Sequence, residues 1–151
     1  MMHSDNGPNV VTRSTSENDL RLAREVFLKD GVTLVVVKNG RILFRSKSHG
    51  ISDLLTMIDD LGRSTEGASL ADSIVGRAAA LLCVYSGIVA VYGAKLSKGA
   101  QSVLNASGVR CEFGTLVPSI LNRKKDDICP YDRAVQGIDD PSVALEKLKS
   151  L

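Results

Sequence analysis

Hydrophobic positions follow a helical period in the first part of the chain and then a strand-like one. Apolar residues fall on one helical face over residues 16–30, and Ser16 with Asp19 three residues later has the spacing of a capping pair at the start of that helix. Residues 32–37 are β-branched and apolar, and Asn39-Gly40 separates them from Ile42-Leu43-Phe44. This pattern predicts two antiparallel strands joined by a tight turn.

The rest of the chain alternates between helical and strand-like patterns. Leucine and isoleucine at helical spacing predict a helix over 52–61, and Ser69 with Asp72 matches a capping box that would open an alanine-rich helix through about Tyr85. Residues 116–121 are ambiguous between strand and helix. Further elements are expected as strands at 88–92 and 109–113, and as helices at 97–106, from Pro130 to a stop at Gly137, and from Pro141 to the C-terminus.

This order of elements predicts an α/β protein. Helices must cover both faces of the central sheet, so we expect a three-layer α/β/α sandwich whose mixed sheet begins with an antiparallel hairpin. Residues 1–15 are polar and lack apolar periodicity, which indicates a disordered N-terminal extension. Residues 16–151 are then expected to form a single domain.

Composition and charge narrow the classes of function. The chain has 151 residues, of which 44% are hydrophobic and 4% aromatic, and its formal net charge is +2. This near-neutral charge argues against a protein dedicated to binding nucleic acids or anionic membranes. Aromatic side chains on which bases could stack are also scarce. Three widely spaced cysteines and no signal-peptide pattern favour a cytoplasmic protein. The longest uncharged run, 78–94, is interrupted by Ser86-Gly87 and reads as buried core.

Familiar catalytic motifs are missing from the sequence. No glycine-rich nucleotide loop and no Gly-x-Ser-x-Gly turn occurs, and His49 is the only histidine outside the first fifteen residues. Neither Cys-x-x-Cys nor His-x-Glu is present. Because a zinc site needs clustered ligands of these types, we expect no metal and no cofactor.

Three segments carry a resemblance to a known family: Leu34-Val-Val-Val-Lys-Asn-Gly-Arg-Ile-Leu-Phe44, Ala71-Asp-Ser-Ile-Val-Gly-Arg-Ala-Ala-Ala-Leu-Leu82 and Ile128-Cys-Pro-Tyr-Asp-Arg-Ala-Val135. Together they resemble a small prokaryotic family of unknown function. The resemblance extends from about Asp19 to Leu148. It implies a cytidine-deaminase-like fold that lacks the zinc motif.

Zinc deaminases hold their metal at the starts of two central helices, with His-or-Cys-x-Glu at one and Pro-Cys-x-x-Cys at the other. The corresponding segments here resemble Ala71-Asp72-Ser73 and Ser97-Lys98-Gly99-Ala100, which contain no thiol and no imidazole. Without a metal to activate water, deamination of a base ring is not expected.

The cysteines differ in what they can do. Cys129 lies at the expected entry of a helix, close in sequence to Arg123 and Arg133, so its thiolate could be favoured; the alternative is a thiol packed at that entry. Cys83 and Cys111 lie in apolar patterns and are interpreted as core residues.

Other candidate residues have both a binding and a structural reading. Asp72 could bind a ligand's hydroxyl or amine, or simply cap its helix, and Gly76 would let a ligand or backbone approach closely. Arg77 is either an anion clamp or a solvated charge, and solvent is favoured. Asn122 and Arg123 precede a polar loop that could bring an anion-binding arginine to the cleft. His49 could act as a base, although the sequence fixes no distance to another candidate. The predicted ligand-binding residues are Asp72, Gly76, Asn122, Arg123 and His49.

These observations favour a metal-free protein that binds a small polar ligand, such as a nucleotide or nucleoside derivative, without deaminating it. The ligand class comes from the resemblance in fold. The alternative is a cysteine-dependent enzyme or redox protein in which Cys129 is the catalytic thiol. A homo-oligomer is a further expectation, because aliphatic edge strands can pair between two copies.

Overall fold

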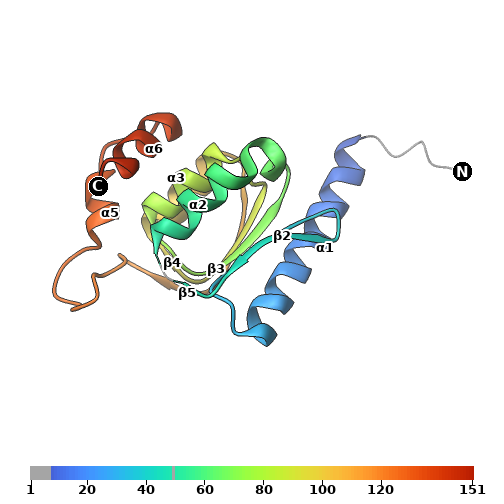
Figure 1. Cartoon of the computed structure of the whole chain (residues 1–151), viewed down its shortest axis with the longest axis horizontal. Helices are drawn as coiled ribbons and strands as arrows, with labels where there is room; N and C mark the ends of the chain where they lie inside the picture. The colour runs from blue at the N-terminus through green and yellow to red at the C-terminus, as the bar shows by residue number, and fades with distance from the viewer. Residues whose placement is uncertain (1–7, 49) are drawn as a thin grey trace, which may run out of the picture.

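A computed structural model describes residues 8–48 and 50–151 and contains a mixed five-stranded sheet with the order β2-β1-β3-β4-β5 (Figure 1). Its strands are β1 (Leu34–Lys38), β2 (Arg41–Ser46), β3 (Ser69–Val75), β4 (Ala90–Ser97) and β5 (Arg110–Val117). Strand β1 pairs antiparallel with both β2 and β3, whereas β3, β4 and β5 are parallel. The expected hairpin and mixed sheet are confirmed.

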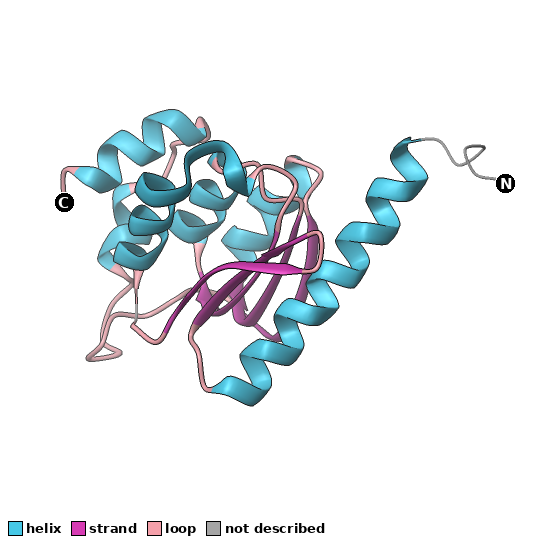
Figure 2. Ribbon diagram, turned by 45° about the vertical axis from the view of Figure 1, so that its right-hand side comes forward, coloured by secondary structure: helices cyan, strands magenta, loops and turns pink. Residues whose placement is uncertain are grey.

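Helices lie on both faces of this sheet, as Figures 1 and 2 show. The helices are α1 (Pro8–Asp30), α2 (Ile51–Leu61), the 3-10 turn η2 (Gly62–Thr65), α3 (Arg77–Tyr85), α4 (Lys98–Ala106), α5 (Pro130–Ala134) and α6 (Pro141–Lys149). Helix α1 packs against β1, β3 and β4 on one face, whereas α3 contacts α2, α4, α5 and α6 on the other. The chain therefore has the expected α/β/α layers.

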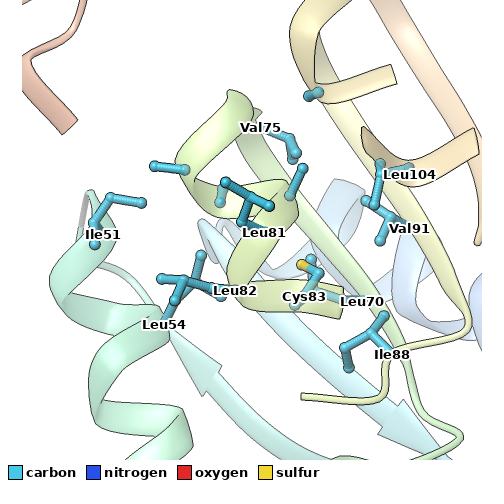
Figure 3. Close-up of a cluster of buried hydrophobic side chains, with 14 of the residues drawn as sticks. Ile51, Leu54, Leu70, Val75, Leu81, Leu82, Cys83, Ile88, Val91 and Leu104 are labelled. Carbon is cyan, nitrogen blue, oxygen red and sulfur yellow. The ribbon is translucent and has the colours of Figure 1, made fainter. Parts of the chain in front are cut away.

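Two apolar clusters fill the layers. The larger one lies between the sheet and α2, α3 and α4 and contains residues such as Leu54, Leu81 and the thiol of Cys83 (Figure 3). The smaller one lies under α1 and includes Leu20 and Tyr92. Both clusters are built mainly from aliphatic side chains. None of the described helices is long and apolar enough to span a bilayer.

The turn between β1 and β2 is held by a side chain from α1. Asn39 and Gly40 adopt the left-handed conformation, with φ of 53° and 77°, which is typical of a type I′ turn. The carboxylate of Asp19 accepts hydrogen bonds from the N–H groups of both residues, at 2.8 and 2.9 Å. Asp19 was expected to cap its own helix, but it stabilises the hairpin instead.

The helix expected over 69–85 is wrong in its first half, because residues 69–75 form β3. The Ser69–Asp72 spacing is accordingly not a capping box. Leu70 and Ala71 have no exposed surface, because β3 lies in the middle of the sheet between layers of helices. Such a strand is apolar on both faces and lacks the alternation that marks a half-exposed strand. Asp72 consequently lies on a strand rather than at a helix N-terminus.

The first helix begins earlier than expected. Helix α1 starts at Pro8 rather than at Ser16, so the prediction of an unstructured extension is wrong for residues 8–15. Residues 1–7, which belong to the same prediction, lie outside the described residues. Proline suits the first turn of a helix, where its missing N–H group has no partner to lose.

Candidate functional site

A cleft of about 970 Å³ lies beside the C-terminal half of β3. Its walls come from β3, the first turn of α2, the segment leading into α3, the loop over residues 118–129 and the start of α5. The lining residues are Gly50, Ile51, Ser52, Leu54, Asp72, Ser73, Ile74, Gly76, Ala79, Ile120, Leu121, Asn122, Arg123, Lys124, Asp126, Asp127, Cys129, Pro130, Tyr131 and Asp132. Its volume is within the range typical of small-molecule sites.

Candidate residues from distant parts of the sequence meet in this cleft. The predicted residues that line it are Asp72, Gly76, Asn122, Arg123 and Cys129. His49 lies outside the described residues, while its neighbour Gly50 lines the cleft. The structure thus places these candidates together; whether they bind a ligand stays a prediction.

Asp72 is a partly buried carboxyl with little support from its neighbours. Its Oδ1 accepts long hydrogen bonds from the hydroxyl of Ser73 at 3.5 Å and from the N–H of Ile74 at 3.4 Å. Burial raises the pKa of Asp72 from its ordinary 3.8 to about 7, and the negative charge of Asp53 adds to this rise, while the hydrogen bonds from Ile74 and Ser73 oppose it. At neutral pH this side chain can therefore either accept or release a proton.

The 118–129 loop folds back on itself through a bridge between Leu121 and Ile128. The N–H of Asn122 donates to the carbonyl of Asp127 at 2.9 Å, and the side-chain amide of Asn122 donates to Asp126 Oδ1 at 2.8 Å. Asn122 thus closes the turn that presents Arg123. Asn122 therefore has a structural role, which the sequence analysis did not predict, in addition to lining the cleft.

Asp132 is a cleft residue that the sequence analysis missed. Its Oδ1 accepts from the N–H of Ala78 at 2.9 Å, so a carboxylate from α5 caps the N-terminus of α3. Burial raises the pKa of Asp132, whereas hydrogen bonds from the Ala78 and Arg77 backbone and the charge of Arg77 lower it. Since 54 residues separate Asp132 from Ala78, no local spacing could have revealed this cap.

Gly76 is required by this cap. A Cβ added there would come within 2.8 Å of Asp132 Cγ and Oδ1, closer than real Cβ contacts. The expectation that Gly76 allows a close approach is therefore met by a protein side chain. Any role of Gly76 toward a ligand stays a prediction.

Arg77 does not extend into solvent as expected. Its side chain is only 21% exposed and donates to the carbonyls of Val135 and Ile138 and to the carboxylate of Asp139. The guanidinium thus fastens the segment between α5 and α6 to the start of α3. The sequence could not indicate these carbonyl partners, because every residue has a backbone carbonyl and none is marked by its side chain.

Cys129 lies at the entry of α5, as predicted, and is partly buried in the cleft wall. Its backbone N–H donates to the carbonyl of Ile120 at 2.9 Å. Arg133, one of the cations expected to support a thiolate, instead pairs with Asp127. Cys83 is fully buried, and burial raises the pKa of its thiol; Cys111 is partly buried against the same core.

The residues at the two helix starts do not fit a zinc ion. Helix α3 begins at Arg77, so Gly76-Arg77-Ala78 stands at the first start, and the assignment of Ala71-Asp72-Ser73 to it is wrong. The second start is Ser97-Lys98-Gly99-Ala100, as expected, and the Ser97 hydroxyl accepts from the N–H of Ala100 at 3.0 Å. Neither start supplies a thiol or an imidazole, and within residues 15–48 and 50–151 no group of three His, Cys, Asp or Glu could hold a metal.

Comparison with solved structures found a DUF1893 family protein from Thermotoga maritima, TM1506, with 26% sequence identity and a TM-score of 0.81. The similarity covers 89% of this chain and 90% of that one. Acinetobacter baumannii RibD is similar at 16% identity and a TM-score of 0.47, over 68% of this chain and 35% of that one. A dCMP deaminase from the cyanophage S-TIM5 is similar at 20% identity and a TM-score of 0.44, over 72% of this chain and 99% of that one.

A search of curated proteins found no match. The family model described as TM1506, domain of unknown function (DUF1893), matches residues 22–151. This match spans the whole sheet, helices α2 to α6 and every residue that lines the cleft, so the chain belongs to the DUF1893 family.

Proposed function

We propose that this protein binds a small polar ligand, of the nucleotide or nucleoside class, in the cleft beside β3 and does not deaminate it. The observation that carries the proposal is the convergence of Asp72, Asn122 and Arg123 on one cleft of about 970 Å³. Specific sites combine apolar walls with a few polar groups, and this cleft has both. The ligand class rests on the resemblance in fold alone, which is weaker support than the site itself.

The same site argues against ordinary deaminase chemistry. Hydrolysis of a base amine needs an activated water, which zinc supplies in the deaminases. The helix starts that would hold zinc instead carry Gly76-Arg77-Ala78 and Ser97-Lys98-Gly99-Ala100, which offer no suitable ligands. Binding without turnover is therefore the function that these side chains support best.

Titration calorimetry against a panel of free bases, nucleosides and nucleoside monophosphates tests this proposal. Native mass spectrometry of freshly purified protein would identify any retained ligand. Ser52→Trp should abolish binding, because exposed Ser52 lines the cleft and a large ring there would fill it. Thr56→Trp is the matched control, since Thr56 is exposed one turn later on α2 and does not line the cleft.

Three results would contradict the proposal. The first is no binding from the panel together with no retained ligand, and the second is binding that Ser52→Trp leaves unchanged. The third is catalytic release of ammonia from a bound base. A covalent adduct found on Cys129 after incubation with the panel would favour the cysteine-dependent enzyme instead.

A further inference from the structure

Most charged side chains of the cleft already have partners within the protein. All four of its carboxylates accept hydrogen bonds, and three of them accept bonds of 2.9 Å or less: Asp126 from the Asn122 amide, Asp127 from the Arg133 guanidinium and Asp132 from the Ala78 N–H. These three pairs shape the cleft. A ligand would have to compete with the partners that these three carboxylates already have.

Asp72 is held by long hydrogen bonds, and the two cations have no partner of their own. Asp72 Oδ1 accepts from the Ser73 hydroxyl at 3.5 Å and from the Ile74 N–H at 3.4 Å. Within residues 15–48 and 50–151, Arg123 and Lys124 form no ion pair or side-chain hydrogen bond. Such long hydrogen bonds are weak, so Asp72 can accept shorter ones from a bound molecule.

Asp72 and the two cations come from different walls of the cleft. Asp72 lies on β3, which is in the middle of the sheet, whereas Arg123 and Lys124 lie on the exposed turn of the 118–129 loop. Apolar surface is also available, since Ile74 is 46% exposed and Leu121 is 50% exposed. The cleft thus offers an acceptor, apolar contacts and a pair of cations.

We propose that the cleft takes a flat ring that presents adjacent N–H donors to Asp72 and carries an anionic group toward Arg123 and Lys124. This inference rests on the proposed function and specifies its ligand. A guanine ring has two adjacent N–H donors that match the two oxygens of a carboxylate, and a phosphate is the anion that arginine and lysine bind well. Guanosine 5′-monophosphate is therefore the probe.

The charged and titratable groups that surround Asp72 favour a donor ligand of this kind. Asp53 approaches it from α2 and Cys83 from α3, and Asp132 lines the same cleft from α5. Two of these are acidic and Cys83 is a neutral thiol, so a bound N–H edge would add to the long hydrogen bonds from Ser73 and Ile74 without meeting a competing cation. Because the ionised carboxylate is the form that accepts two N–H bonds, affinity should fall as the pH drops below 7.

The test is a calorimetric titration of guanosine 5′-monophosphate, inosine 5′-monophosphate and guanosine between pH 6 and pH 8.5. Asp72→Asn should weaken binding of guanosine 5′-monophosphate by roughly 10- to 100-fold at pH 8. Inosine 5′-monophosphate lacks one donor and should bind about tenfold more weakly than the guanine nucleotide. Guanosine has no phosphate to titrate near pH 6, so its affinity should also fall below pH 7, and Asp72→Asn should abolish that fall.

The cations are tested by charge removal. Arg123→Gln with Lys124→Gln should weaken guanosine 5′-monophosphate binding by about fivefold and leave guanosine unaffected. Lys125→Gln is the matched control, because Lys125 lies on the same turn but does not line the cleft. The inference is overturned if Asp72→Asn changes the dissociation constant by less than about twofold, or if the double variant weakens guanosine and its monophosphate equally.

Failure of this inference is distinguishable from failure of the proposed function. If another member of the panel binds in a manner sensitive to Ser52→Trp and the guanine nucleotide does not, the ligand assignment is wrong and the proposed function stands. If nothing binds and nothing is retained, both are overturned.

Discussion

Replacing Asp72 by Asn should stabilise the ligand-free protein, and the gain should depend on pH. The carboxyl is partly buried without a cation, which raises its pKa from 3.8 to about 7. A folded-state pKa above the unfolded value means that the stabilising contribution is complete below pH 3.8 and is lost as the pH rises through 7. At pH 8.5 the folded protein must hold a buried negative charge, whereas asparagine stays neutral.

The size of the effect follows from the shift. A rise of about three pH units at roughly 1.4 kcal/mol per unit corresponds to at most about 4 kcal/mol at pH 8.5. At pH 5 the unfolded Asp72 is ionised and the folded one is protonated, so the advantage of asparagine should shrink to less than about 2 kcal/mol. Residual water in the cleft would solvate the buried charge and so reduce the free-energy differences at both pH 8.5 and pH 5.

Urea unfolding followed by circular dichroism at several pH values between 5 and 8.5 measures this difference. Asp59→Asn serves as the control, because Asp59 is exposed on α2 and its replacement should change the free energy of unfolding by less than about 0.5 kcal/mol. A difference between wild type and Asp72→Asn that is constant over this pH range would refute the reasoning. So would a variant that is less stable than wild type at pH 8.5.

Three further predictions concern the cleft and its supports. Gly76→Ala should destabilise the fold by about 1–2 kcal/mol, because the new Cβ displaces the Asp132 cap. In a double-mutant cycle with Asp132→Ala, the two losses of stability should not be additive. Additive losses would show that the two residues act independently and would contradict this prediction. Arg77→Gln should cost about 1–3 kcal/mol in urea unfolding, because carbonyls on the α5–α6 segment lose a charged donor; an unchanged midpoint would contradict this. Peptide mapping after iodoacetamide treatment of the native protein should find Cys129 labelled and Cys83 unlabelled, and equal labelling would be inconsistent with the packing.

Local patterns predicted the elements whose cause is local. Asn39-Gly40 marked the hairpin because the turn itself requires the left-handed conformation. Asp140 before Pro141 marked the start of α6, and its side chain does accept from the N–H of Ser142 at 2.8 Å. Ser97 likewise caps α4. At these positions the interaction that ends or begins an element spans only a few residues.

The misread positions depend on residues far away in the sequence. Residues 69–75 became a strand because neighbouring strands pair with both edges and helices cover both faces, and none of this is encoded within the segment. Asp19 had the spacing of a helix cap, yet its acceptor oxygens serve a turn 20 residues later. The candidate cleft residues were named from an expected helix start, from a polar loop and from the resemblance to a known family. The partners of Arg77 lie 58 to 62 residues away, so they could not be predicted, as the Asp132 cap could not.

Side chains of this chain cap the starts of both central helices. In the zinc enzymes the starts of two central helices converge on the ion, which organises both ends and activates water. Here Asp132 caps the start of α3 and the Ser97 hydroxyl caps the start of α4, so side chains of the chain satisfy both ends. Gly76 keeps the first cap possible, because any Cβ there would collide with the carboxylate. These caps stabilise the layers without using Asp72 or the cations of the 118–129 loop, which are the groups that we propose recognise a ligand.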